Sequence, residues 1–239
     1  LTGQTAALTF TFNERVDNLA AADISAPGGV VSNVLQNAVN KNVWTATYTP
    51  SAAINGVSET ISVAGAVTAD VAGNKLAASG NTNFTLLVDD VSPAVGSIAY
   101  GAADGRLALG EAVNLTVTTS EVVNVVTTGG TPTLALANGG TATYTAGTGT
   151  STLTFSYTPA AGQDTADLAT ATSNALALNG GTIKDLAGNT VTASGFDNVN
   201  PAGTLIVDTT APIVSSIAYG SNDGRLALGE AVNLTVTLS

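Results

Sequence analysis

The chain has 239 residues, of which 44% are hydrophobic and 10% are charged, and its formal net charge is −11. This composition can bury a core and excludes a disordered acidic tail, while the scarcity of Lys and Arg argues against nucleic acid or an anionic membrane as partner. The absence of Cys and His excludes disulfides, thiolate metal sites, Cys nucleophiles and His-based catalytic triads.

Short alternating segments follow one another along the chain. Hydrophobic residues alternate with Thr or Ser at 8–12, 44–48, 115–118 and 153–157. A period of two predicts half-buried strands with Thr and Ser facing water. Turns rich in Gly, Asn and Pro are predicted at 27–29, 55–56, 138–140 and 179–181. A short helical turn is predicted at 166–174. The pattern as a whole predicts an all-β fold of tandem immunoglobulin-like β-sandwiches.

A thirty-residue stretch occurs twice in the chain. Residues 91–120 and 210–239 are offset by 119 positions (210 − 91), and 23 of their 30 aligned positions are identical. A repeat with the period of a small domain indicates a tandem array. Because the sequence also contains no Met, we expect it to be a piece of a longer protein.

Weaker internal matches extend the repeat over the rest of the chain. The matched pairs are 3–16 with 110–123, 70–74 with 185–189, and 87–93 with 206–212. The domains predicted from them are 1–90, an Ig-like domain lacking its first strand; 91–209, a complete Ig-like domain; and 210–239, the first two strands of a third repeat.

This division predicts an open sheet edge at one end of the chain and an unpartnered hairpin at the other. Exposed strand edges accept further strands. We therefore expect residues 213–239 to fill the missing edge of the first domain in a neighbouring copy, by head-to-tail strand exchange, or else to pack poorly. The other expected partners are neighbouring repeats of the same chain. No apolar run reaches the length of a membrane span, so we expect no membrane insertion.

Three motifs recur in the same order. They are Asn/Ser-Glu-x-Val at 13–16 and 120–123, Asp-x-Ala-Gly-Asn at 70–74 and 185–189, and Val-Asp-x-x-x-Pro at 88–93 and 207–212. Together with Thr-Phe-Ser-Tyr-Thr-Pro at 154–159, they resemble the bacterial Ig-like repeats of giant, RTX-type surface adhesins. The resemblance implies type I secretion, an extracellular or cell-surface location, a role in cell adhesion and biofilm formation, and calcium at the domain junctions.

The topology of an Ig-like sandwich brings three separate segments to one end of residues 91–209. The incoming linker, the end of the second strand and the turn before the last strand meet there. The oxygen ligands expected at this junction are Asp89, Asp90, Glu121, Asp185 and Asn189. Calcium takes about 6–8 oxygen ligands, which such a set supplies without His or Cys. The alternative interpretation is that Asp-x-Ala-Gly-Asn is simply a turn, closed by its own Asp and Asn side chains.

Two further acidic groups are weaker candidates for calcium. A second site is predicted at the opposite end of the complete domain, from Asp104, Glu111, Asp164 and Asp208. The junction site has an incomplete equivalent in the first domain, formed by Glu14, Asp70 and Asn74, where the incoming linker is missing.

The sequence therefore predicts a structural extender in a giant bacterial surface adhesin, with domains rigidified by calcium at their junctions. It is not expected to be an enzyme. The alternatives are a ligand- or carbohydrate-binding Ig-like module and an accessory spacer of a secreted multidomain enzyme. Trp44 and Tyr48 could stack on a sugar, but their alternation with Thr favours core packing.

Overall fold

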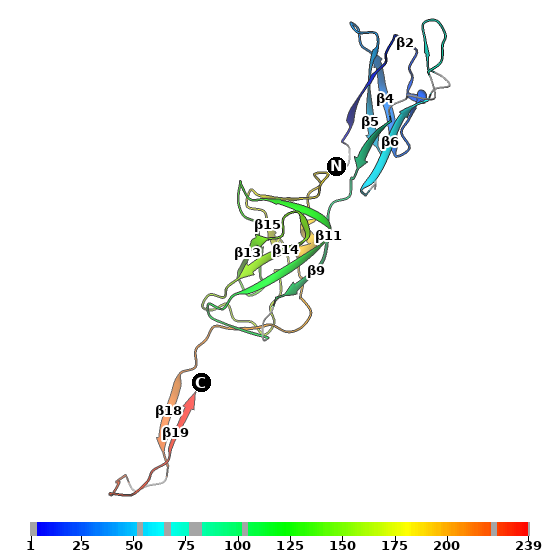
Figure 1. Cartoon of the computed structure of the whole chain (residues 1–239). Helices are drawn as coiled ribbons and strands as arrows, with labels where there is room; N and C mark the ends of the chain where they lie inside the picture. Colours follow the sequence, from blue (N-terminus) through cyan, green and yellow to red (C-terminus); the bar gives the residue numbers. More distant parts are fainter. Residues whose placement is uncertain are drawn as a thin grey trace.

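The computed structural model describes residues 4–51, 55–64, 68–76, 83–101, 105–220 and 224–238. Strands dominate these ranges, and the predicted all-β fold is confirmed. In Figure 1 three bodies follow one another in sequence order: body one (residues 6–88), body two (residues 95–208) and a tail hairpin (residues 214–238). The predicted boundaries near 90 and 209 lie in the segments that connect these bodies.

Body one contains three small antiparallel sheets, ordered β1-β5-β4, β3-β6-β8 and β2-β7. Its elements are β1 (Ala6–Thr11), β2 (Val16–Asp17), η1 (Ala21–Asp23), β3 (Ile24–Ser25), β4 (Gly29–Gln36), β5 (Val43–Pro50), β6 (Val57–Val63), β7 (Ala69–Asp70) and β8 (Phe84–Val88). The predicted alternation is present, because Leu8 and Ile61 are buried with Trp44 and Tyr48 in one core. Core packing of Trp44 and Tyr48 is thus confirmed, and their role as a sugar platform is not supported.

Body two is larger and is centred on one long strand. Its elements are β9 (Val95–Tyr100), β10 (Arg106–Ala108), β11 (Val113–Val126), β12 (Thr133–Ala135), β13 (Thr141–Ala146), β14 (Thr150–Tyr157), β15 (Leu176–Ala177), β16 (Thr182–Lys184), η2 (Ala193–Phe196) and β17 (Ile206–Asp208). The main sheet runs β15-β12-β13-β14-β11-β16, with β9 also paired to β11, while β10 pairs in parallel with β17. The core includes Phe155 and Tyr157 from β14, and Val117 and Val123 from β11.

Strand β11 changes partners partway along its length. Residues 113–118 pair with β14, and residues 124–126 pair with β16. Between them the register shifts. Thr118 pairs with Thr152 and Val123 pairs with Thr150, so β11 uses more residues than β14 over this stretch. The expected end of this strand at Glu121 was wrong, because β11 continues to Val126, and Val125 and Val126 find new ladder partners on β16.

The helical turn predicted at 166–174 was also wrong. The Leu168 N–H donates to the Leu205 carbonyl at 2.9 Å, and the Thr170 N–H donates to the Val199 carbonyl at 3.0 Å. Bonds to a distant segment thus take the donors that a helix would need, and Leu168 is buried in the core. Within the described ranges the only helices are two single 3-10 turns, and neither has the length or apolar character of a membrane span.

The tail hairpin consists of β18 (Val214–Tyr219) and β19 (Leu234–Leu238). Its register repeats that of body two, since Tyr219 pairs with Leu234 as Tyr100 pairs with Leu115. Its surroundings do not repeat: Leu234 is 65% exposed, whereas Leu115 is 1% exposed. The same local sequence therefore forms the same strand pair in both segments, but its apolar side chains pack into a core only in body two.

This contrast predicts different costs for the same substitution. Leu115→Ala should lower the free energy of unfolding of body two by about 2–5 kcal/mol, because it leaves a cavity in a packed core. The matched Leu234→Ala should change it by less than about 0.5 kcal/mol, because that side chain fills no core. Urea denaturation of both variants beside the parent chain measures the difference, and equal losses would contradict the burial assigned to Leu115.

Candidate metal site at the domain junction

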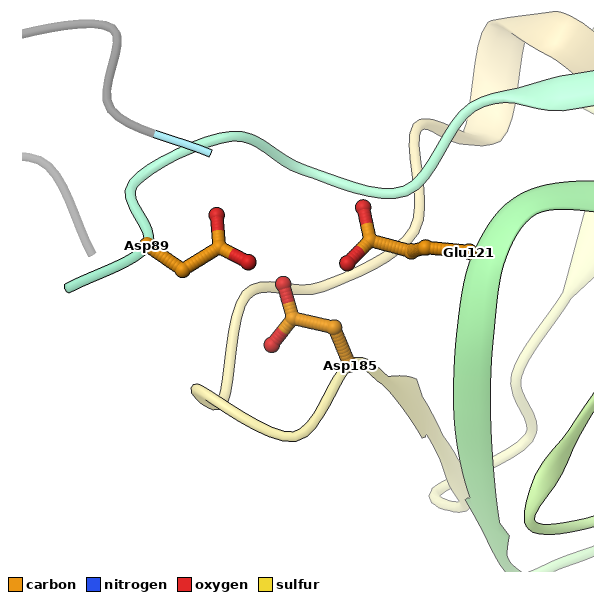
Figure 2. Close-up of side chains that lie close together, drawn as sticks. All are labelled: Asp89, Glu121 and Asp185. Carbon is orange, nitrogen blue, oxygen red and sulfur yellow. The ribbon is translucent and has the colours of Figure 1, made fainter. Parts of the chain in front are cut away.

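Three carboxylates from separate segments meet where body one joins body two. Asp89 directly follows β8, Glu121 lies in the register shift of β11, and Asp185 directly follows β16. One carboxylate oxygen from each lies within 4.8 Å of the other two, and Figure 2 shows the three groups pointing toward one another. No other trio of acidic side chains in the described ranges comes together in this way.

A tight turn fixes Asp185. The Asn189 N–H donates to Asp185 Oδ1 at 2.8 Å, and Asn189 Nδ2 donates to Asp185 Oδ2 at 2.7 Å. Gly188 has a φ of +97°, which a residue with a side chain rarely adopts. Asp185 and Asn189 are only 4% and 1% exposed. The turn interpretation is therefore correct for the backbone, and the same turn holds the Asp185 carboxylate in the cluster.

The linker is tied to body two by its own hydrogen bonds. Asn189 Nδ2 also donates to the Asp89 carbonyl at 3.1 Å, so the amide joins the turn to the linker. Farther along, the Ala94 N–H donates to Ser120 Oγ at 3.0 Å, and the Ser120 N–H donates to the Ala94 carbonyl at 2.8 Å. Sequence reasoning did not predict a role for Ser120, although its place directly before Glu121 in the recurring motif was an available signal.

Glu121 carries the unsatisfied charge of the site. Its Oε1 atom is buried and has no hydrogen-bond partner. Burial raises the pKa of Glu121 above its ordinary value, and the negative charges of Asp89 and Asp185 raise it further. Two like charges at 4–5 Å repel by about 3–4 kcal/mol at an effective dielectric constant of about 20. The metal-free arrangement is thus electrostatically unfavourable when all three carboxylates are ionised.

A hard divalent cation would remove this cost. Oxygens that share one calcium ion at about 2.3–2.6 Å lie no more than roughly 5 Å apart, which agrees with the spacing observed here. The donor set is all oxygen, as calcium prefers, and it includes Glu121, whose buried Oε1 has no hydrogen-bond partner. Asp89, Glu121 and Asp185 would hold the ion, with Asn189 positioning two of them. Asp90, which the sequence also suggested, is not in the close group.

The equivalent residues of body one share the turn but not the cluster. Asn74 donates to Asp70 through its N–H and through Nδ2, both at 2.8 Å, which repeats the bonds of Asp185. The side-chain bond from Asn74 lowers the pKa of Asp70. Glu14 is exposed, and among the described residues no third carboxylate joins Glu14 and Asp70. This set is therefore not assembled as a site within body one.

The second predicted group is not brought together in the described ranges. Asp164 accepts the Thr209 N–H at 2.6 Å and its hydroxyl at 2.7 Å, which lowers the pKa of Asp164. Glu111 accepts the Ala108 N–H at 3.0 Å, and Asp208 accepts the Thr210 N–H at 3.0 Å. These carboxylates each satisfy nearby backbone or hydroxyl donors. Asp104, the fourth predicted member, lies outside the described residues.

The electrostatics of Glu121 predict a pH-dependent stability. Because its pKa is raised in the folded state, the metal-free protein should lose stability as pH rises from the unfolded value of about 4.3 through the folded value. Glu121→Gln should remove that loss and raise the free energy of unfolding at pH 7 by about 0.2–1 kcal/mol, a range that allows for solvent screening. Denaturation in a chelator between pH 4 and pH 8 measures this.

The matched control is Glu14→Gln, at the same motif position in body one. It should give no such gain at pH 7, because no pair of carboxylates surrounds Glu14 in the described structure. A Glu121→Gln variant that is no more stable than the parent at pH 7, or a gain that is as large at pH 4, would contradict the repulsion assigned to this site.

Comparison with known proteins bears on the type of domain. Residues 1–86 match the family model of the bacterial Ig-like domain. No curated protein and no solved structure gives a significant match to the chain. The expected resemblance is therefore confirmed at the level of the domain: the chain contains a bacterial Ig-like domain.

Proposed function

We propose that this chain is an extender segment of a large bacterial surface adhesin, stiffened by calcium at the junction between its domains. The observation that carries the proposal is the meeting of Asp89, Glu121 and Asp185 at the point where one body follows the next. A spacer needs defined geometry between repeats more than a deep catalytic cleft. The bacterial Ig-like match and the near-identical repeat are consistent with such an array.

Calcium would act on the linker. Asp89 belongs to the connecting segment, whereas Glu121 and Asp185 belong to the sheets of body two. An ion held by all three would fasten the end of body one to body two and offset the repulsion among the carboxylates. The hydrogen bond from Asn189 to the Asp89 carbonyl already holds the linker beside the site, which lowers the entropic cost of binding the ion.

An extracellular location at the bacterial surface, reached by type I secretion and serving adhesion or biofilm formation, is part of the proposal. A site with three protein carboxylates suits the weak range of calcium affinities, about 10⁻⁴–10⁻³ M, that extracellular modules use. The absence of Cys means that the chain relies on packing and, on this proposal, on calcium rather than on disulfides.

The alternative of a carbohydrate-binding module is less well supported. Its aromatic candidates, Trp44 and Tyr48, are buried in the core of body one. Tyr48 lies on β5 with its side chain fully enclosed, so its ring has no face open to a sugar. A spacer in a secreted enzyme would use the same junction chemistry, and the neighbouring domains of the full protein would separate that reading from an adhesin.

Calcium binding at the junction predicts a stabilisation confined to body two. Calcium at 100 times its Kd should add about 2.7 kcal/mol to the free energy of unfolding. At about 4–8 °C per kcal/mol, the melting transition of body two should rise by roughly 10–20 °C. Differential scanning calorimetry with and without chelator measures the shift, and small-angle scattering should show a narrower spread of interdomain angles when calcium is present.

Asp185→Asn should abolish the calcium response, because it removes a carboxylate from the cluster. Asp70→Asn is the matched control, since Asp70 has the same turn and the same two bonds from its Asn but no cluster around it. It should leave the response of body two intact. Equal melting and scattering profiles with calcium and with chelator, or an undiminished response in Asp185→Asn, would overturn the proposed function.

A further inference from the structure

Thr119 lies in the register shift of β11, two residues before Glu121. Its side chain is 4% exposed, and its hydroxyl donates to the Glu121 carbonyl at 2.7 Å and to the Ser151 carbonyl of β14 at 3.1 Å. A hydroxyl has one proton, which these two carbonyls share. One buried side chain therefore links the backbone of a cluster carboxylate to the neighbouring strand.

The bond to Ser151 lies where the ladder between β11 and β14 is interrupted. The pairing on β14 goes from Thr152 directly to Thr150 and passes over Ser151. Thr119 keeps a ladder partner on β9, Val95, but has none on β14. The hydroxyl thus holds β11 to β14 across the shift, at the point where β11 leaves regular pairing.

Body one has the same place without the hydroxyl. The counterparts of Thr119 and Ser151 there are Phe12 and Asn42. The Phe12 N–H donates to the Asn42 carbonyl at 2.9 Å, so a backbone donor makes the cross-strand bond that the Thr119 hydroxyl makes in body two. Because a Phe side chain has no donor, it cannot bond the carbonyl of Glu14 as Thr119 bonds that of Glu121.

The two strands also continue differently. β11 runs through Glu121 to Val126, whereas in body one β1 ends at Thr11 and β2 begins only at Val16. Glu14, which lies between β1 and β2, is exposed. The same glutamate position thus belongs to one continuous strand in body two and to the connection between two short strands in body one.

The backbone around Glu121 is fixed on both sides. Ser120, directly before it, exchanges two hydrogen bonds with Ala94 of the linker, and the Thr119 hydroxyl holds the Glu121 carbonyl. Fixing both peptide units around a Cα atom fixes the direction in which its side chain leaves the strand. In Figure 2 the Glu121 side chain points toward the other two carboxylates of the cluster.

We propose that Thr119 is the positioning residue of the junction site: its hydroxyl holds β11 in the shifted register that turns Glu121 toward Asp89 and Asp185. The consequence for calcium binding rests on the proposed function, whereas the positioning of Glu121 is a property of the metal-free chain. The residue at this position differs between the repeats, since it is Phe12 in the first and Leu238 in the third. The hydroxyl thereby separates a repeat that assembles the cluster from repeats that keep only its glutamate motif.

A double-mutant cycle on the metal-free chain tests the positioning. In chelator at pH 7 and low ionic strength, Glu121→Gln should stabilise the parent, because it removes a repelled charge. In a Thr119→Val background the same substitution should gain less than about half as much, since Glu121 is then released from the cluster. Thr118→Val, on the exposed face of the same strand, is the matched control and should keep the full gain.

Urea denaturation of these variants measures the gains. A hydroxyl that only stabilised the fold would lower the stability of Thr119→Val but leave the gain from Glu121→Gln unchanged, and that result would overturn the proposal. A parent chain without any gain would overturn it as well.

Calcium titration of the full chain by calorimetry provides the second measurement. Residues that orient metal ligands typically contribute 10–100-fold to affinity, so Thr119→Val should raise the calcium Kd at least about tenfold. Thr119→Ser, which keeps the hydroxyl, and the control Thr118→Val should stay within about threefold of the parent. If Thr119→Val does not fold, Thr119→Ala against Thr119→Ser makes the same comparison. A Kd that is equal with and without the hydroxyl would overturn the role of Thr119 in calcium binding.

The two measurements separate this inference from the proposed function. A parent that binds no calcium, but in which Thr119→Val removes the gain from Glu121→Gln, would leave the positioning standing and count against the calcium site. A parent that binds calcium, with the affinity and the gain both unchanged by Thr119→Val, would do the reverse.

Discussion

The position of the junction site follows from one irregularity, the change of partners along β11. Its first half pairs with β14 and its last three residues pair with β16, so one continuous strand has different partners along its length. The register shift that allows this leaves Glu121 outside the regular ladder. A polar group at such a point must find a partner or carry a cost, because ladder geometry no longer dictates its surroundings.

The junction site lies at that irregularity. The turn after β16 and the linker after β8 both arrive where β11 crosses over, and Asn189 bonds each of them. Hydrogen bonds from Asn189 thus hold the Asp185 carboxylate and the backbone of Asp89 in place, although the negative charges of the cluster repel one another. The backbone thus holds three mutually repelling carboxylates at one point. A bound cation would stabilise such an arrangement.

The repeated segment shows how far local sequence determines local structure. Residues around Leu115 and Leu234 form the same strand pair in the same register. Their burial differs because Leu115 packs into the hydrophobic core of body two, whereas β19 has only β18 as a described neighbour. In body one, β1 pairs with β5, and its residues Leu8 and Phe10 lie in or against the core of that body.

The strands are predictable from the amino-acid pattern, because alternation of apolar residues with Thr or Ser marks which side chains enter a core. The burial of Leu8, Trp44 and Phe155 follows directly from that pattern. It also indicated the segments that could meet at the junction. Which acids meet depends on tertiary contacts: Glu121 joins Asp89 and Asp185 while Asp90 does not, and Asp164 accepts a hydrogen bond from the Thr209 hydroxyl. The physical reason is that hydrogen-bond partners from distant segments, absent from any local window, fix where a carboxylate points.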